Sequence, residues 1–160
     1  WAGEAGQFRP VPQRRRLADR HDTMPEPAMH TDARPAPCPC DSALPYAACC
    51  GRWHAGARHL QAPSAEALMR SRYSAHVLGL ADYLRDTWHP QTRPAGPLLP
   101  DPAVRWLGLE VRRHAVLDAD HAVVEFVARS KLGGRAVRMH ETSRFVRENG
   151  RWWYVDGDVA

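Results

Sequence analysis

Residues 38–50 read CPCDSALPYAACC and contain all four cysteines of the 160-residue chain. Free cysteines in a protein core are scattered along a sequence like other small apolar residues. Four thiols within thirteen consecutive positions therefore indicate one shared site. The pattern is Cys-x-Cys, then eight residues, then Cys-Cys, so the excursion between the two pairs can bring all four thiols together.

This pattern is typical of a zinc site. Structural zinc takes four ligands in a tetrahedron, and thiolates bind it at about 2.3 Å. A segment this short has almost no apolar core, so a bound metal would supply much of its folding free energy. We therefore predict that Zn²⁺ is the cofactor and that the ligands are Cys38, Cys40, Cys49 and Cys50.

Other uses of the cysteines remain as alternatives. Two disulfides would need an oxidising compartment, and the adjacent Cys49 and Cys50 could bridge each other only with strain. An iron–sulfur or redox site is the main alternative to zinc. His54 could in principle replace a thiolate, but with four cysteines available we expect it outside the ligand set.

Composition describes an ordinary soluble protein, with 25% charged residues, 44% hydrophobic residues and a net charge of +4. No apolar run of about 18 residues exists, so we expect no membrane span. The N-terminal residues lack the apolar stretch of a secretory signal, which predicts a cytoplasmic location. Acidic residues are interspersed with the basic ones, so nucleic acid is not an expected partner except through the ribosome. The oligomeric state is not indicated.

The first 36 residues have a different character from the rest of the chain. Prolines stand at positions 10, 12, 25, 27 and 35, and hydrophobic periodicity is weak. Such a segment buries too little apolar surface to offset its ordering entropy. We predict that residues 1–36 are a disordered extension, or one misassigned ahead of a start at Met24 or Met29.

Two helices followed by a sheet are predicted after the cysteine segment. Ser64 is a plausible helix N-cap with Glu66 in the first turn, Gly79 breaks the helix, and a second one runs from Ala81 to Trp88. A period of two then predicts strands at about 105–116, 120–130, 135–147 and 151–156, joined by LDAD, KLGG and ENG. Helices followed by an antiparallel meander indicate an α+β fold.

The segment CPCDSALPYAACCG resembles the SEC-C motif, a small zinc-binding module known from the C-terminal tail of the translocation ATPase SecA. The motif reads Cys-Pro-Cys-Gly-Ser-Gly, a short helical stretch, and then Cys-His or Cys-Cys followed by Gly. Asp41 and Ala43 stand where the motif has glycine. If position 41 needs a positive φ, aspartate is among the better substitutes.

Further stretches resemble the YchJ-like family of uncharacterised bacterial SEC-C proteins: LMRSRYSAHVLGLADYLRDTWHP, WLGLEV, VEFVAR and SRFVRENGRWWYVDG. The resemblance implies a cone-shaped, nuclear transport factor 2-like α+β domain, with helices packed on a curved antiparallel sheet. We therefore expect three parts: the extension 1–36, the SEC-C zinc motif 37–56 and the cone-shaped domain 62–158. Some members carry a second SEC-C motif, whereas Cys50 is the last cysteine here.

An enzyme that used the cone-shaped domain as a pocket would need ionisable groups on its otherwise apolar face. On the third predicted strand, Val137, Met139 and Phe145 share one parity, and we expect them to face the core. Glu141 and Ser143 share that same parity. Burial would raise the pKa of such a glutamate and suit it to acid–base work. The structural alternatives are exposure at a strand bulge or an ion pair with Arg72, so we name Glu141, Ser143 and Arg72 only as a candidate pocket and predict no catalytic residue.

Two functions are therefore compared. The favoured hypothesis is a binding or adaptor protein whose zinc motif docks a partner related to chaperones, translocation or the ribosome, as the SEC-C resemblance implies. The alternative is a small-molecule enzyme of isomerase, dehydratase or hydrolase type that uses the cone pocket. A third interpretation leaves zinc purely structural. If Trp, Leu and Met side chains filled the pocket, the enzyme hypothesis would fail.

Overall fold

The computed structural model describes residues 35–96, 98 and 100–160. The predicted disorder of the N-terminal extension therefore falls, except for residues 35 and 36, outside the described part of the chain. No helix in that part is long and apolar enough to cross a membrane.

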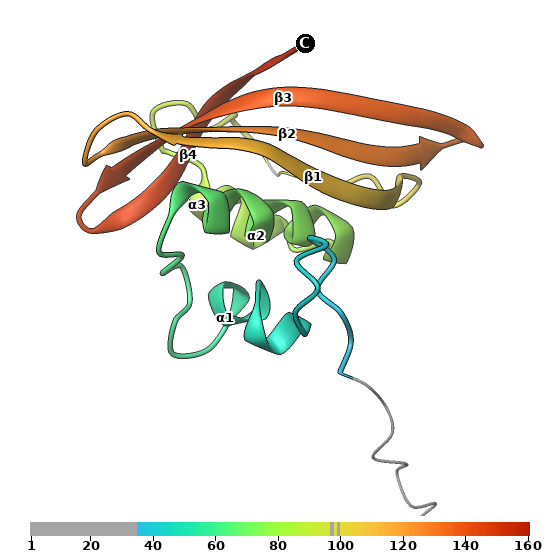
Figure 1. Ribbon diagram of the computed structural model, residues 1–160, viewed down its shortest axis with the longest axis horizontal. Helices are drawn as coiled ribbons and strands as arrows, with labels where there is room; N and C mark the ends of the chain where they lie inside the picture. The colour runs from blue at the N-terminus through green and yellow to red at the C-terminus, as the bar shows by residue number, and fades with distance from the viewer. Residues whose placement is uncertain (1–34, 97, 99) are drawn as a thin grey trace, which may run out of the picture. The chain divides into compact units, whose positions relative to one another are not determined.

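The described residues form three layers (Figure 1). A curved sheet lies on one side, two helices cover one of its faces, and a small module with short helices packs beneath them. The elements are η1 (Tyr46–Ala48), α1 (Gly51–His54), α2 (Ala65–Leu78), α3 (Ala81–Thr87), β1 (Arg105–Val116), β2 (His121–Leu132), β3 (Arg135–Glu148) and β4 (Arg151–Val159).

The strands form an antiparallel sheet in the order β1-β2-β3-β4, as the sequence predicted. Tight turns make this meander possible. Gly133 and Gly134 join β2 to β3 with φ of 57° and 76°, and Asn149 and Gly150 join β3 to β4 with φ of 53° and 72°. Two successive positive φ angles match the right-handed twist of the flanking strands.

The ends of α2 are set by the two residues that the sequence singled out. The Ser64 hydroxyl accepts a hydrogen bond from the Ala67 amide at 3.1 Å and so caps the first turn. Gly79, with a φ of 72°, ends the helix in the left-handed conformation. The helix thereby stops where the chain must turn into α3.

The core lies between α2 and the concave face of the sheet. Leu68 on α2 is 2% exposed and Val124 on β2 is fully buried, which follows from the period-two pattern of the strands. The prediction was wrong for Val137, which is 46% exposed. It has the expected parity, but it lies near the β2–β3 hairpin, where the two strands extend beyond the helices (Figure 1).

Candidate metal centre and the adjacent cavity

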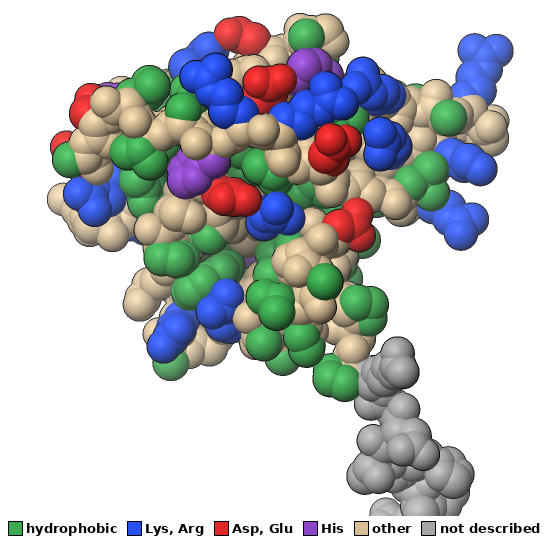
Figure 2. Space-filling model, in the orientation of Figure 1, with side chains coloured by type: hydrophobic (Ala, Val, Ile, Leu, Met, Phe, Trp, Pro, Cys, Tyr) green, Lys and Arg blue, Asp and Glu red, His purple; other side chains and the backbone are tan. Residues whose placement is uncertain are grey.

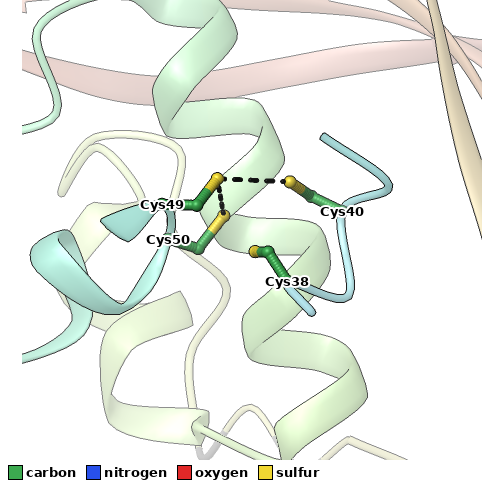
Figure 3. A group of neighbouring side chains, drawn as sticks. All are labelled: Cys38, Cys40, Cys49 and Cys50. Carbon is green, nitrogen blue, oxygen red and sulfur yellow. Dashed lines mark hydrogen bonds between the residues drawn. The ribbon is translucent and has the colours of Figure 1, made fainter. Parts of the chain in front are cut away.

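The four cysteines lie together in the small module (Figure 3). Their Sγ atoms all lie within 4.8 Å of one another, with Cys40 and Cys49 at 3.6 Å and Cys49 and Cys50 at 4.0 Å. Four thiolates at about 2.3 Å from one zinc ion would stand about 3.8 Å apart in a regular tetrahedron. All four are free thiols and no more than 7% exposed. The cluster therefore has the ligand type, spacing and burial of a single-ion site.

The backbone of the module brings the two cysteine pairs together. The Cys38 amide donates to the Leu44 carbonyl at 2.9 Å, which closes the loop that carries Cys38 and Cys40. Cys49 and Cys50 lie between η1 and α1, at the point where the chain returns to this loop. The eight-residue excursion thus acts as the sequence analysis expected.

Both departures from the motif's glycines adopt the left-handed conformation. Asp41 has a φ of 59° and Ala43 a φ of 66°. The aspartate also does something that glycine could not, because its Oδ2 accepts a hydrogen bond from the Leu109 amide at 3.0 Å. Leu109 is on β1, an edge strand of the sheet, so Asp41 ties the cysteine loop to the larger domain.

The cysteine cluster packs directly against α2. The Ser74 hydroxyl lies 3.6 Å from Cys38 Sγ, and Arg70 donates to the Cys40 carbonyl at 3.0 Å. Within the module, the Ser42 hydroxyl lies 3.1 Å from Cys49 Sγ. Hydroxyl groups near thiolates orient them and tune their basicity. The cluster therefore has supporting contacts from two parts of the chain.

His54 uses both ring nitrogens outside the cluster. Its Nδ1 lies 2.6 Å from the Tyr46 hydroxyl and its Nε2 lies 2.8 Å from the Ser71 carbonyl. Since the carbonyl can only accept, Nε2 carries the proton and Nδ1 accepts from the tyrosine. Burial lowers the pKa of His54, which favours this neutral form. The residue joins the module to α2 and is not one of the clustered groups.

Electrostatics within the cluster favour a bound cation. Hydrogen bonds from Cys40 and Cys50 lower the pKa of Cys38, while the contact with Cys38 raises the pKa of Cys50. Four buried thiols cannot all ionise without a compensating positive charge. A divalent ion would supply that charge, and its binding would release protons.

The candidate pocket residues also come together, in a cavity of about 300 Å³ between α2 and the sheet. Arg72, Glu141 and Ser143 all line it. Ser143 donates to Glu141 Oε1 at 3.0 Å, and so does the hydroxyl of Tyr154 at the same distance. The alternative of an ion pair between Arg72 and Glu141 is not realised among the described residues, where none joins them within 4.0 Å.

Sequence analysis did not predict several features of this cavity. Tyr154 donates a hydrogen bond to Glu141, and Trp88 and His76 also line the cavity. Gly157 makes room for the Glu141 carboxylate, because a Cβ at position 157 would clash with Glu141 Oε1. The pairing of Gly157 with Ser143 across β3 and β4 explains this, and only the register of the sheet reveals it.

Comparison with known proteins finds family matches to two segments of the chain. Residues 64–157 match the family described as YchJ, middle NTF2-like domain, and residues 34–52 match the SEC-C motif. A UPF0225 protein of Bordetella parapertussis is 60% identical over 126 residues, which make up 78% of this chain and 94% of the relative. Another, from Cupriavidus pinatubonensis, is 58% identical over 133 residues, which are 79% and 91% of the two chains.

Two solved structures of SEC-C motif containing proteins share the fold. The solution structure from Rhodopseudomonas palustris has a TM-score of 0.67 and 34% identity, and it covers 78% of this chain and 98% of that one. The crystal structure from Psychrobacter arcticus has a TM-score of 0.64 and 31% identity, with 78% and 83% covered.

Proposed function

The chain belongs to the YchJ-like family of SEC-C motif proteins, whose curated members here are UPF0225 proteins, and from this premise we propose that it is a zinc-binding adaptor. In this proposal Cys38, Cys40, Cys49 and Cys50 bind one Zn²⁺ ion. The metal fixes the SEC-C module against α2, and the module docks a protein or ribosomal partner. The single observation that carries the proposal is the buried cluster of four thiols within 4.8 Å.

The spacing of the thiols supports one ion over a cluster of several. An iron–sulfur cluster occupies the volume between its ligands and would need thiols further apart than 3.6 to 4.0 Å. Zinc accepts a tetrahedron of four thiolates without redox chemistry. Unoxidised thiols are maintained in the cytoplasm, which is where we place the protein.

The outer surface of the module supports a docking role. Leu44 is 48% exposed, and its neighbours Ala43, Ala47 and Ala48 are exposed as well. These residues lie on the loop that the cysteines hold, next to the cluster. An apolar surface whose shape depends on a metal ion is suited to binding a protein.

A basic surface at the far end of the sheet supports the ribosome as the partner. Four exposed cations lie at or beside the end of the sheet where β2 turns into β3: Arg105, Lys131, Arg135 and Arg138. None of the four has an ion-pair partner within the described ranges. Figure 2 shows several Lys and Arg side chains at this end of the sheet, and others elsewhere on the same face of the molecule. Such cations attract the phosphate backbone of RNA, in a salt-dependent manner.

Co-sedimentation with purified ribosomes tests the adaptor proposal. The native protein should pellet with ribosomes at low salt, and Leu44→Asp should reduce the bound fraction while the zinc content stays unchanged. The matched control is Leu117→Asp, because Leu117 is 64% exposed on the β1–β2 turn, away from the module. Equal binding by native protein and Leu44→Asp would remove the docking role of the module, and no binding by either would remove the ribosome as the partner.

The alternative function is a small-molecule enzyme. The cavity between α2 and the sheet supports this alternative, because it has room for a ligand. Glu141 is the candidate base, because Ser143 and Tyr154 both donate to Oε1 and leave Oε2 without a partner in the described structure. Catalysis would require this carboxylate to act on a bound substrate. Any turnover found with a cavity ligand should disappear in Glu141→Gln while binding persists.

A further inference from the structure

The cavity above the concave face of the sheet has the size and the walls of a small-molecule site. Its volume of about 300 Å³ stands at the lower end of the range for ligand pockets. Several of its lining residues are partly exposed, among them His76, Trp106 and Met139, so the cavity is open to solvent. The walls are mainly aromatic: Tyr73, Trp88, Trp106, Phe126, Phe145 and Tyr154. Aromatic walls suit a ligand with a flat, apolar ring.

Arg72 is a buried charge without an acidic partner in the described structure. It is 8% exposed, and its guanidinium carbon lies 4.3 Å from the centre of the Tyr154 ring. Nη1 donates to the Leu84 carbonyl at 2.8 Å and to the Thr87 hydroxyl at 2.7 Å. Those bonds hold the group in place but bring no negative charge to it.

The other two nitrogens of the Arg72 guanidinium, Nε and Nη2, lie on one edge of the group, here called its free edge. Neither donates to an acceptor among the described residues, and Arg72 lines the cavity. This edge of a guanidinium matches the two oxygens of a carboxylate in a bidentate pair. A phosphate dianion is a poorer match, because no second cation lines the cavity in the described part of the chain: burial lowers the pKa of His76 to about 4, so that residue is neutral at pH 7.

Glu141 restricts which anions fit. Its carboxylate lies over Gly157, where the missing Cβ leaves room, and Ser143 and Tyr154 hold it by their hydroxyl groups. A second acidic group on a ligand would be repelled by this carboxylate. A hydroxyl or amino group could instead donate to Oε2. We therefore expect the cavity to favour a ligand with a single negative charge.

We propose that the cavity binds a small aromatic monocarboxylate, with the carboxylate on Nε and Nη2 of Arg72 and the ring against the aromatic walls. The inference goes beyond the adaptor function and does not depend on whether the cysteines bind zinc. Burial lowers the pKa of Arg72 only to about 10, so the guanidinium stays charged at neutral pH. Binding should accordingly persist between pH 6 and pH 9.

Titration of the isotope-labelled full chain tests the proposal, with 3-hydroxybenzoate as the probe and 3-hydroxybenzamide as its neutral counterpart. The carboxylate should shift amide signals in the cavity strands and α2, and the amide should bind at least about tenfold more weakly. Arg72→Gln should weaken carboxylate binding by about tenfold or more. Arg85→Gln is the matched control, since Arg85 is exposed on α3 and bonds only to the Gly96 carbonyl among the described residues.

A second variant covers the case in which Arg72→Gln does not fold. Ala128 lines the cavity and is 2% exposed, so Ala128→Leu reduces the space in the cavity while Arg72 and Glu141 are both kept. It should abolish binding and keep the native spectrum elsewhere. The proposal is overturned if the native protein binds no carboxylate at millimolar concentration, if the amide binds equally well, or if Ala128→Leu binds as well as the native chain.

Discussion

Asp41 and Ala43 show what single residues contribute to the cysteine loop. Both have positive φ angles, of 59° and 66°, at positions where the SEC-C motif has glycine. A left-handed conformation costs a non-glycine residue about 1–2 kcal/mol. Asp41 offsets this cost with its bond to the Leu109 amide, whereas no side-chain bond can do so for alanine. Replacing Asp41 and replacing Ala43 by glycine should therefore change the free energy of unfolding by different amounts.

We predict that Ala43→Gly raises the free energy of unfolding by about 1 kcal/mol, because it relieves backbone strain. Urea denaturation of the zinc-loaded protein measures the change. Asp41→Gly should bring no comparable gain, because it loses the bond to β1 along with the strain. A decrease in stability on Ala43→Gly would show that position 43 is not strained.

A second prediction for single residues concerns the zinc affinity of the metal site. Cys49→Ser should abolish tight zinc binding, because a neutral hydroxyl replaces a thiolate ligand. Ser42→Ala keeps all four thiols and removes only the hydroxyl next to Cys49, so it should weaken zinc affinity by about 10-fold to 100-fold. Competition against a chelator of known affinity measures both. Equal affinity in all three proteins would contradict the assigned ligand.

The residues that carry the site could be identified from sequence only in part. Spacing and residue type are local signals, and they identified the four cysteines and the odd polar pair Glu141 and Ser143. The bond from the Leu109 amide to Asp41 joins positions 68 residues apart and leaves no local pattern. The free edge of Arg72 likewise depends on packing between elements.

At the scale of elements, the local rules account for most of the fold. Ser64, Gly79 and the Asn149–Gly150 turn set boundaries through backbone chemistry that a sequence displays directly. The strands were predicted from alternation, but alternation does not say which part of a strand the helices cover. That is why Val137 was assigned to the core although it is 46% exposed.

We predict that Ser64→Ala lowers the free energy of unfolding by about 1 kcal/mol through loss of the N-cap bond to Ala67. Thermal or urea unfolding of the zinc-loaded protein provides the measurement. Ser64→Asp keeps a capping acceptor and should stay close to the native stability. If both variants were equally destabilised, the capping bond would not be the cause.

At the scale of the whole molecule, the module and the larger domain share one helix. One side of α2 contacts the module, through Ser71 to His54 and Ser74 to Cys38, while Arg72 lines the cavity. Sequence analysis treated the two parts separately, because contacts between distant segments cannot be derived from one sequence. Metal binding should therefore influence the stability of more than its own loop.

We predict that zinc removal by a chelator lowers the unfolding temperature, because the metal stabilises only the folded chain. Hydrogen exchange should accelerate first in residues 38–56 and then in α2, while the paired strands β2 and β3 stay protected. The native protein with zinc restored is the control. Unchanged exchange in the cysteine segment after complete zinc removal would show that the module folds without metal.

Metal analysis of protein purified under reducing conditions tests the central claim most directly. Mass spectrometry of the intact native complex, combined with elemental analysis, gives the identity of the ion and its number per chain. The account predicts one zinc ion and four unoxidised thiols per chain. A chain that carries no zinc when its thiols are reduced, or one that carries iron instead, would contradict it.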